Sequence, residues 1–333
     1  MMKKVRWGIL STAKIGVVKV IPAIQNSHCN EVMAVASRDI DKAKIAAENL
    51  RIERYYGSYE ELLDDTEIDA IYNPLPNNLH VEWTIKAMQA GKHVLCEKPI
   101  GIDTAEAELL LEATKRFPEL KVMEAFMYRF HPQWQKVQLL INEGVIGSVK
   151  SVHTHFSYYN IDPKNIRNRP EVHGGALMDI GCYCISFPRF IYQDEPVSVI
   201  GTMEIDPKMG IDRQTSGILK FKDGKTASFT CSTQLMPFQR TNIVGTDGQI
   251  IVEIPVNAPP AEVSKIELIT KTKSEIIQFD PVDQYSLQAD AFSESILNDT
   301  PVPTPLTDAI ANMKVIDAIV SSSKRNTWIE ISQ

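Results

Sequence analysis

Short apolar runs alternate with longer amphipathic segments over the first 125 residues, and this rhythm restricts the possible fold more than any other feature. Runs typical of strands lie at 5–10, 32–36, 55–56, 69–73, 94–96 and 121–124. The segments between them show helical periodicity. Sequential strands separated by a helix pair in parallel through a right-handed crossover. The spacing therefore predicts an α/β domain, residues 1–125, built on a doubly wound parallel sheet.

The loop after the first run, Ser11-Thr12-Ala13-Lys14-Ile15-Gly16, stands where a dinucleotide-binding fingerprint has three glycines. The three places hold Ser11, Ala13 and Gly16. Small residues preserve the close approach of the backbone to a pyrophosphate, and Ser11 and Thr12 can donate hydrogen bonds to a phosphate at the helix N-terminus. The loop therefore predicts a dinucleotide-binding Rossmann domain. Pro22 is expected to kink or shorten the helix predicted at 14–25.

The second run ends at Ser37-Arg38-Asp39, where an NAD-binding site would offer a carboxylate to the 2′-hydroxyl of the ribose. A hydroxyl and a guanidinium at this point suit a 2′-phosphate instead. The motif favours NADP over NAD. The alternative is that Arg38 only caps a surface loop.

A loop stiffened by two prolines follows the run at 69–73 and contains Leu75, Asn77 and His80. One interpretation places Asn77 and His80 near the nicotinamide ribose. The alternative makes Asn77 the cap of a helix at 79–90 and His80 a residue on the surface of that helix.

The run at 94–96 ends abruptly on Glu97, Lys98 and Pro99. In an open α/β sheet the ligand crevice lies at the carboxyl ends of the strands, so Glu97 and Lys98 are expected at its mouth. A lysine beside a carboxylate can hydrogen-bond a substrate oxygen and move a proton. The bond to Pro99 can be cis at small cost, which would turn Lys98 sideways. The alternative is a solvated Glu-Lys pair and a turn proline.

From Met127 onward the pattern changes to strands joined by tight turns. Strands are expected at 149–156, 197–204, 216–221, 226–231, 240–244 and 250–254. Hairpin turns such as Lys222-Asp223-Gly224 make consecutive strands antiparallel. Residues 126–333 are therefore expected to form an α+β domain on a large open, mainly antiparallel sheet, closed by helices at 283–298 and 307–321. A sheet covered on one face leaves the other exposed, so we expect this substrate-binding domain to form a homodimer or higher homo-oligomer.

Gly174 and Gly175 interrupt the antiparallel pattern and open a helix expected to reach residue 192. Asp179 and Tyr183 are four residues apart, hence neighbours on one helical face. A lysine ammonium near a tyrosine hydroxyl stabilises the phenolate, so such a tyrosine can act as a general acid or base near neutral pH. Asp179 would orient the tyrosine or the substrate hydroxyl. The alternative is a buried helix with Tyr183 in the core and Asp179 interacting with the helix dipole.

Four further residues are candidates on their position alone. Tyr158, Asn165 and Arg167 lie on the strand and loop that lead to Gly174, and Arg129 follows the last strand of the first domain. The first three can line a substrate pocket and Arg129 can contact the cofactor. The alternative for each is a polar residue that supports the fold.

Composition narrows the range of partners. The 333 residues carry a formal charge of −7 without a long basic run, which argues against nucleic acid and anionic membrane surfaces. The first residues lead directly into a strand and no segment is apolar for long enough to span a bilayer, so a cytoplasmic protein is expected. The five cysteines are expected to be reduced thiols, and Cys182 and Cys184 alone do not make a zinc site, so no metal is expected.

Together these motifs make the sequence resemble the Gfo/Idh/MocA oxidoreductases, the family of glucose–fructose oxidoreductase and inositol dehydrogenase. The resemblance covers essentially the whole chain, and Glu97-Lys98-Pro99 with Gly174-Gly175, Asp179 and Tyr183 carries most of it. The most similar branch contains dimeric dihydrodiol dehydrogenase and NADP-dependent D-xylose dehydrogenase. Tyr183 departs from the histidine of inositol dehydrogenases, and Ser11 and Ala13 depart from the glycine-rich consensus of the family.

The resemblance implies hydride exchange between a nicotinamide and a secondary alcohol or carbonyl of a sugar, polyol or dihydrodiol. It implies Lys98 and Tyr183 as the catalytic pair, either of which can carry the proton, supported by Asp179. The residues implied for NADP, or alternatively NAD, are Ser11, Thr12, Ala13, Ile15, Ser37, Arg38, Leu75, Asn77, His80, Glu97, Lys98 and Arg129. Those expected at the substrate are Tyr158, Asn165, Arg167 and Asp179. Because the family also includes regulators, the alternative function is a non-catalytic dinucleotide-binding sensor.

Overall fold

The computed structural model describes residues 3–331 and divides the chain into two compact units. Unit 1 contains the chain up to Met127 together with Asp283–Ile310. Unit 2 contains Tyr128–Val282 together with the residues from Ala311 onward. Each unit has its own sheet.

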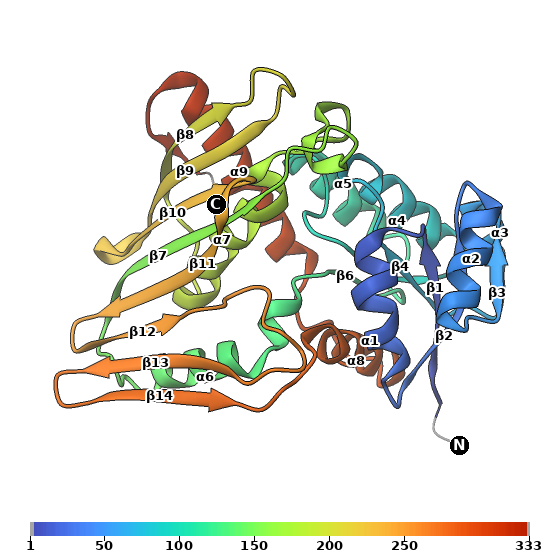
Figure 1. Cartoon of the computed structure of the whole chain (residues 1–333), viewed down its shortest axis with the longest axis horizontal. Helices are drawn as coiled ribbons and strands as arrows, with labels where there is room; N and C mark the ends of the chain where they lie inside the picture. The colour runs from blue at the N-terminus through green and yellow to red at the C-terminus, as the bar shows by residue number, and fades with distance from the viewer. Residues whose placement is uncertain (1–2, 332–333) are drawn as a thin grey trace. The chain divides into compact units, whose positions relative to one another are not determined.

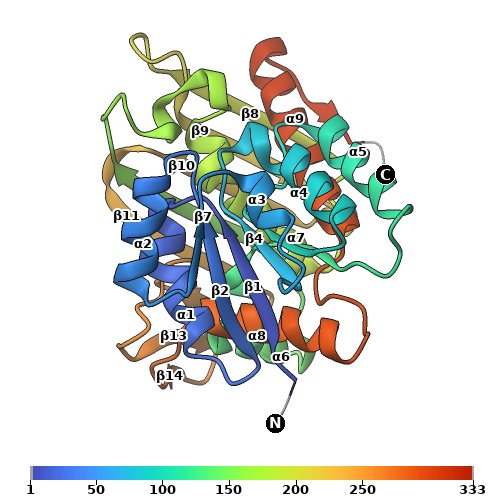
Figure 2. The same cartoon turned by 90° about the vertical axis from the view of Figure 1, so that its right-hand side faces the viewer.

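Unit 1 is built on a six-stranded parallel sheet of order β3-β2-β1-β4-β5-β6, and Figure 2 shows β1, β2 and β4 side by side. Its strands are β1 (Val5–Leu10), β2 (Asn30–Ala36), β3 (Arg54–Tyr56), β4 (Ala70–Asn73), β5 (His93–Cys96) and β6 (Val122–Glu124). The order reverses direction at β1, so the carboxyl ends of β1 and β4 form the switch point at which sheets of this kind bind dinucleotides. The doubly wound parallel sheet predicted from the sequence is confirmed.

Helices cross between these strands where the periodicity predicted them. They are α1 (Ile21–Gln25), α2 (Ile40–Leu50), α3 (Tyr59–Leu63), α4 (His80–Gln89) and α5 (Thr104–Thr114). A π-helical turn, η1 (Gly16–Val20), precedes α1, and Pro22 lies in the first turn of α1. A proline has no N–H to donate and crowds the preceding turn, and a wider turn relieves both problems. Pro22 is therefore accommodated without ending the helical segment.

Helix α8 (Gln284–Leu297) belongs to unit 1 although most of unit 2 precedes it in the chain. The Asp290 carboxylate accepts a hydrogen bond from the Asn30 amide at 2.8 Å and another from the Ser27 hydroxyl. The Asn30 side-chain oxygen in turn accepts from the indole of Trp7 at 2.9 Å. These hydrogen bonds join α8 to the start of β2 and, through Asn30, to β1. Residues 283–310 therefore pack with the first 127, a grouping that the predicted division into 1–125 and 126–333 did not include.

Unit 2 contains a nine-stranded sheet of order β14-β13-β12-β11-β7-β10-β9-β8-β15 (Figure 1). Its strands are β7 (Val149–Tyr159), β8 (Ser198–Ile205), β9 (Asp212–Lys220), β10 (Thr226–Ser232), β11 (Gln234–Gly245), β12 (Gly248–Val252), β13 (Ser264–Thr270), β14 (Ser274–Phe279) and β15 (Ile329–Glu330). The pair β7–β10 is parallel and the other neighbours are antiparallel. The predicted open, mainly antiparallel sheet is confirmed, with β13, β14 and β15 as additional strands.

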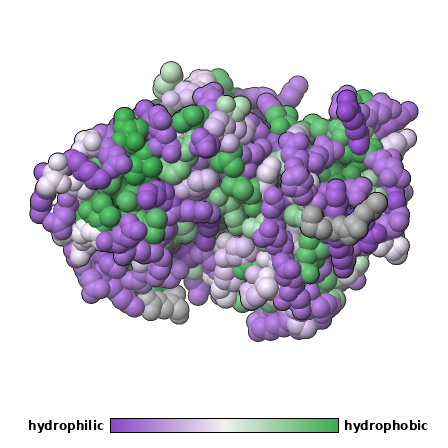
Figure 3. All heavy atoms as spheres, turned by 90° about the horizontal axis from the view of Figure 1, so that it is seen from below, coloured by the Kyte–Doolittle hydropathy of each residue, from purple (hydrophilic) through white to green (hydrophobic). Residues whose placement is uncertain are grey.

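Helices α6 (Pro132–Asn142) and α7 (Cys182–Tyr192) accompany this sheet, together with the part of α9 (Leu306–Arg325) that begins at Ala311. Helix α7 packs on β7 and β10, and α9 packs on β8, where Ile319 lies so close to Gly201 that a Cβ would be 2.8 Å from its side chain. In Figure 3 hydrophobic residues form separate green patches on a mostly hydrophilic surface. A hollow of about 790 Å³ lies on the nine-stranded sheet and is lined by residues of β7, β8, β9, β10 and β11.

Candidate active site

The loop after β1 provides the first half of the expected cofactor site. Ser11 has a φ of +73°, the left-handed conformation that a fingerprint glycine would adopt without strain. Its hydroxyl oxygen accepts a hydrogen bond from the N–H of Ala13 at 3.2 Å, which holds the turn. A Cβ on Gly16 would only make ordinary contacts, the nearest being 3.6 Å from the Tyr72 ring. Close packing of the helix therefore does not require the glycine at 16, contrary to the usual reason for the third fingerprint glycine.

The end of β2 carries the residues expected to recognise the adenosine ribose. Ser37 is buried and its hydroxyl oxygen accepts from the N–H of Asp39 at 3.2 Å, whereas Arg38 is exposed. The Asp39 carboxylate accepts from the N–H groups of Asp41 and Lys42 and so caps α2. The nearest carboxylate to the strand end is thus used as a helix cap. The exposed guanidinium is the group that suits a phosphate.

His80 connects two backbone segments of unit 1. One ring nitrogen lies 2.7 Å from the carbonyl oxygen of Pro99 and the other 2.6 Å from that of Leu75. The ring is 1% exposed, so the interpretation of His80 as a residue on the helix surface is wrong. Burial lowers its pKa to about 4, against the two backbone hydrogen bonds that raise it.

Asn77 does not cap α4, contrary to the second interpretation of this loop. Pro76 occupies the N-cap of the 3₁₀ turn η2 (Asn77–Leu79), and Leu79 occupies the N-cap of α4. Asn77 lies inside this short turn, three residues before α4 begins at His80, so it is not at the position from which a side chain can cap α4. The predicted cofactor contacts of Leu75, Asn77 and His80 remain predictions.

The segment after β5 places Glu97 and Lys98 at the carboxyl end of the parallel sheet, as expected. The peptide bond between Lys98 and Pro99 is cis. The hydroxyl of Tyr72, at the end of β4, donates to Glu97 Oε1 at 2.7 Å, and the N–H of Ile100 donates to the buried Glu124 at 2.7 Å. Tyr72 was not among the sequence candidates, because a tyrosine inside an apolar strand carries no sign of a polar partner.

In unit 2, two of the predicted substrate residues, Tyr158 and Arg167, bind the carboxylate of a third, Asp179. The Tyr158 hydroxyl donates to Asp179 Oδ2 at 2.6 Å, and Arg167 Nε donates to Asp179 Oδ1 at 2.8 Å. The Asp179 side chain is 11% exposed and that of Arg167 is 39% exposed. Burial, and then the charge of Asp179, raise the pKa of Tyr158, so its hydroxyl stays protonated and remains a donor. The arrangement holds a charged carboxylate in one orientation.

Gly174 and Gly175 precede this carboxylate at a point where the surrounding atoms leave no room for a side chain. A Cβ on Gly174 would lie 2.4 Å from the carbonyl oxygen of Arg167, and the N–H of Gly175 donates to the same oxygen at 2.7 Å. The helix then begins as a π-helical turn, η6 (Leu177–Gly181), that continues into α7. The 3.6-residue period used to place Asp179 beside Tyr183 therefore does not apply to residues 177–181. Such turns occur frequently at functional sites.

Tyr183 is 4% exposed and lies among aromatic rings, with its centroid 6.1 Å from that of Tyr128 and 6.3 Å from that of Phe156. Two other candidates make local contacts. The Asn165 side chain accepts from the N–H of Arg167 at 3.1 Å and caps the 3₁₀ turn η4 (Ile166–Asn168). Arg129 donates to the Ser186 hydroxyl at 2.9 Å. These contacts agree with the fold-supporting alternative, and the predicted substrate and cofactor roles remain predictions.

The sheet order of unit 1 and the small-residue loop after β1 define a dinucleotide-binding Rossmann domain. Comparison with protein families agrees: residues 5–125 match the oxidoreductase family with an NAD-binding Rossmann fold, and residues 134–251 match the GFO/IDH/MocA C-terminal domain. The chain belongs to the GFO/IDH/MocA oxidoreductase family. The resemblance stated from the sequence is thereby confirmed.

The similar proteins include both activities of the branch that the sequence indicated. A D-xylose 1-dehydrogenase (NADP⁺) of Haloferax volcanii is 35% identical over 98% of this chain and 99% of its own. A trans-1,2-dihydrobenzene-1,2-diol dehydrogenase of Xenopus laevis is 34% identical over 75% of each chain. A solved 3-ketoreductase of Actinomadura kijaniata, in complex with NADP and TDP-benzene, is 28% identical with a TM-score of 0.89, over 96% of this chain and 98% of that one. All three carry the names of enzymes, and none supports the sensor alternative.

Between residues 3 and 331, no helix combines the length and the apolar character needed to cross a membrane. All five cysteines are free thiols, and four of them are buried.

Proposed function

We propose that this protein is an NADP-dependent oxidoreductase that moves a hydride between the nicotinamide and a secondary alcohol or carbonyl of a sugar, polyol or dihydrodiol. The observation that carries the proposal is the Asp179 carboxylate, held by Tyr158 and Arg167 on the helical segment that also bears Tyr183. In a chain of this oxidoreductase family, such a cluster suits the orientation of a substrate hydroxyl. The relatives that act on D-xylose and on dihydrodiols indicate the class of substrate.

The donor groups at the ends of β1 and β2 fit NADP. Hydroxyls of Ser11 and Thr12 and the backbone N–H groups before η1 suit a pyrophosphate. The buried Ser37 hydroxyl and the exposed Arg38 guanidinium suit a 2′-phosphate, with Asp39 used as a cap. When bound, the nicotinamide would supply or accept the hydride at C4.

Lys98 and Tyr183 are proposed to act on the same substrate oxygen. In the oxidation direction Tyr183, as the phenolate, accepts the hydroxyl proton while the Lys98 ammonium stabilises the developing oxyanion. In the reduction direction the neutral Tyr183 hydroxyl donates that proton to the carbonyl oxygen and becomes the phenolate. Solved variants of the Actinomadura ketoreductase replace a lysine by alanine and a tyrosine by phenylalanine. Those two residues are separated by almost the same length of chain as Lys98 and Tyr183. This spacing supports the proposed pair.

The test is turnover, followed as reduction of NADP or NAD at ~340 nm with panels of aldoses, polyols and trans-dihydrodiols. Lys98→Ala and Tyr183→Phe are expected to lower kcat by roughly 10²- to 10⁴-fold, the usual worth of a positioned acid or base. Matched controls are Lys86→Ala on the surface of α4 and Tyr192→Phe at the end of α7, both expected to keep wild-type turnover. Binding of NADP without turnover of any substrate would contradict the proposal.

Cofactor choice has a test of its own. Arg38→Ala is expected to raise the KM for NADP by roughly tenfold to a hundredfold, because about 1.5–3 kcal/mol of charge-assisted hydrogen bonding is lost. The KM for NAD should change little, since NAD lacks the 2′-phosphate. Equal effects on both cofactors would assign Arg38 to the surface loop alone.

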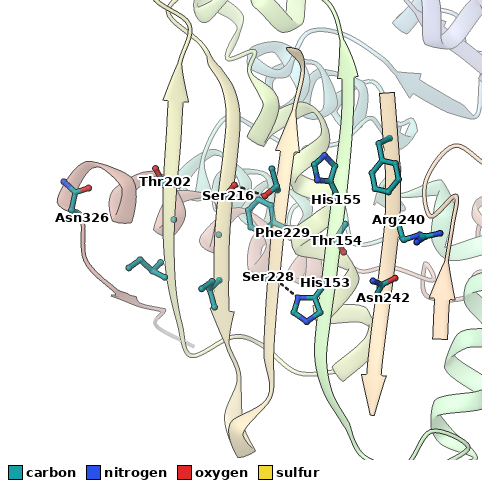
Figure 4. Close-up of a pocket in the computed structure, with 16 residues that line it drawn as sticks. His153, Thr154, His155, Thr202, Ser216, Ser228, Phe229, Arg240, Asn242 and Asn326 are labelled. Atoms are coloured by element: carbon teal, nitrogen blue, oxygen red, sulfur yellow. Dashed lines mark hydrogen bonds between the residues drawn. The ribbon is translucent and has the colours of Figure 1, made fainter. Parts of the chain in front are cut away.

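We also propose that a second copy of the chain covers the open face of the nine-stranded sheet. His153 and His155 project from β7 beside Arg240 and Asn242 of β11 (Figure 4). The exposed Ile218 and Phe238 lie along the same hollow. In analytical ultracentrifugation the wild type should sediment as a dimer or larger and Ile218→Glu as a monomer. Leu109→Glu, on the exposed side of α5, serves as the control. A monomeric wild type would refute this assembly.

A further inference from the structure

Asp212, the first residue of β9, provides a distant cap for the helical segment that carries Asp179 and Tyr183. Its carboxylate is buried, and Oδ2 accepts from the N–H of Leu177 and from the Thr215 hydroxyl, both at 2.7 Å. Leu177 is the first residue of η6. The first N–H groups of a helical segment have no partner inside it, so Asp212 satisfies a donor that would otherwise be orphaned.

Gly175, the second glycine of the pair, lies against the Asp212 carboxylate. A Cβ on Gly175 would lie 1.9 Å from Asp212 Oδ1, and the φ of Gly175 is +114°. Gly175 can adopt this conformation and leave the space open because it has no side chain. The Asp212 carboxylate can therefore occupy this position only because residue 175 is a glycine.

The same short segment is connected to Asp179. The N–H of Asp179 donates to the carbonyl oxygen of Gly175 at 3.0 Å, and the N–H of Gly175 donates to that of Arg167 at 2.7 Å. Arg167 in turn pairs with the Asp179 carboxylate. A change at Asp212 is thus transmitted through Gly175 and Leu177 to the residues proposed to act on the substrate.

The charge of Asp212 has no cationic partner among the groups that shift its pKa. Burial raises that pKa to about 6, and hydrogen bonds from Thr215 and from the backbone lower it. Arg213, the next residue, pairs with the exposed Glu204. The elements packed against β9 carry three titratable groups: Glu204 on β8, Cys231 on β10 and Asp179 on η6. Helix α7, which continues η6, adds Cys182, Tyr183, Cys184, Arg189 and Tyr192. Burial raises the pKa of Cys231 and of Cys184, so these two thiols stay neutral beside it.

We propose that Asp212 is a positioning residue for the reaction: as a carboxylate it holds η6 in the arrangement that presents Asp179 and Tyr183, and protonation of Asp212 loosens that arrangement and lowers turnover. A neutral carboxyl group is a weaker acceptor than a carboxylate for the N–H of Leu177. This inference rests on the proposed oxidoreductase function. Turnover is expected to fall as the pH drops below about 6, while dinucleotide binding, assigned to unit 1, is unaffected.

The experiment measures kcat from pH 5 to 8, together with the KM for NADP, on the substrate found in the screen. Asp212→Asn carries no charge and should behave like the protonated wild type, with kcat lower on the order of tenfold and no decline toward acid pH. The KM for NADP should stay within a factor of about two, since the cofactor residues are elsewhere. Thr215→Val removes a hydrogen bond that lowers the pKa of Asp212, so its acid decline should begin at higher pH.

Asp206→Asn is the matched control. Asp206 is as buried as Asp212 and accepts from the N–H groups of Lys208 and Met209, but it caps the turn between β8 and β9. Its variant should keep the wild-type kcat and pH profile even if it is less stable. The same acid decline in Asp212→Asn as in the wild type would overturn the positioning role while leaving the proposed function intact. Absence of turnover in the wild type would overturn the proposed function, and this inference with it.

Discussion

His80 offers a measurable link between burial and the pH dependence of stability. The folded pKa of about 4 lies below the ordinary value of 6.5, because the ring is buried and its desolvation outweighs the two carbonyl contacts. Between pH 6.5 and about 4, the His80 ring is protonated in the unfolded chain but stays neutral in the folded chain. His80 therefore gives its full stabilisation above pH 6.5, and this stabilisation is lost as the pH falls toward 4.

The magnitude follows from these two values. Between pH 7.5 and 5, a histidine with pKa values of 6.5 unfolded and about 4 folded loses about 2 kcal/mol of the free energy of unfolding. Urea unfolding of the wild type and of His80→Gln at both pH values measures the difference. The variant loses hydrogen bonds at both pH values, so only its pH dependence is compared. It should lose about 2 kcal/mol less than the wild type on going to pH 5.

Two comparisons make this result decisive. His28→Gln, at an exposed position, should keep the wild-type dependence on pH. His131 is also buried, and burial lowers its pKa to about 4. Its contribution to the pH dependence of stability is therefore present in the wild type and in both variants. A protonated ring could donate to both carbonyl oxygens at once. A pKa of His80 above 6.5 by NMR titration would show that these two acceptors outweigh burial and would refute the reasoning. So would a His80→Gln variant that loses as much stability as the wild type on going to pH 5.

Two further variants test the carboxylate cluster of unit 2. Gly175→Ala should destabilise the protein by more than about 3 kcal/mol in urea unfolding, because the new Cβ would overlap Asp212 and the φ of +114° is strained for alanine. Gly144→Ala, with a φ of +69° and open space around its Cβ, should cost only about 1 kcal/mol, and equal losses would contradict the steric argument. Tyr158→Phe should lower the free energy of unfolding by about 1.5–3 kcal/mol, since the carboxylate of Asp179 loses a buried donor. An additive double-mutant cycle with Asp179→Asn would mean that this hydrogen bond contributes nothing.

The local pattern of the sequence determined the architecture and the placement of the main motifs. Strand runs alternating with helices predict a parallel sheet, because side-chain periodicity reflects backbone conformation and burial within a few residues. Glu97 and Lys98 follow a buried strand, so their place at the carboxyl end of the sheet needed no further information. Strand β14 escaped prediction because most of its side chains are exposed and leave no alternation to recognise.

Tertiary structure alone decided which distant groups became partners. Asp212 lies 35 residues from Leu177, and Asp290 lies 260 residues from Asn30, and no local pattern links the members of either pair. The neighbours of His80 likewise appear only when the loop at Leu75 and the segment at Pro99 meet in the folded chain. A buried polar group must find a partner, but the chain can supply it from any element that packs nearby. The sequence thus determined which residue types were available. Packing determined how their side chains are oriented and how far burial shifts their pKa values.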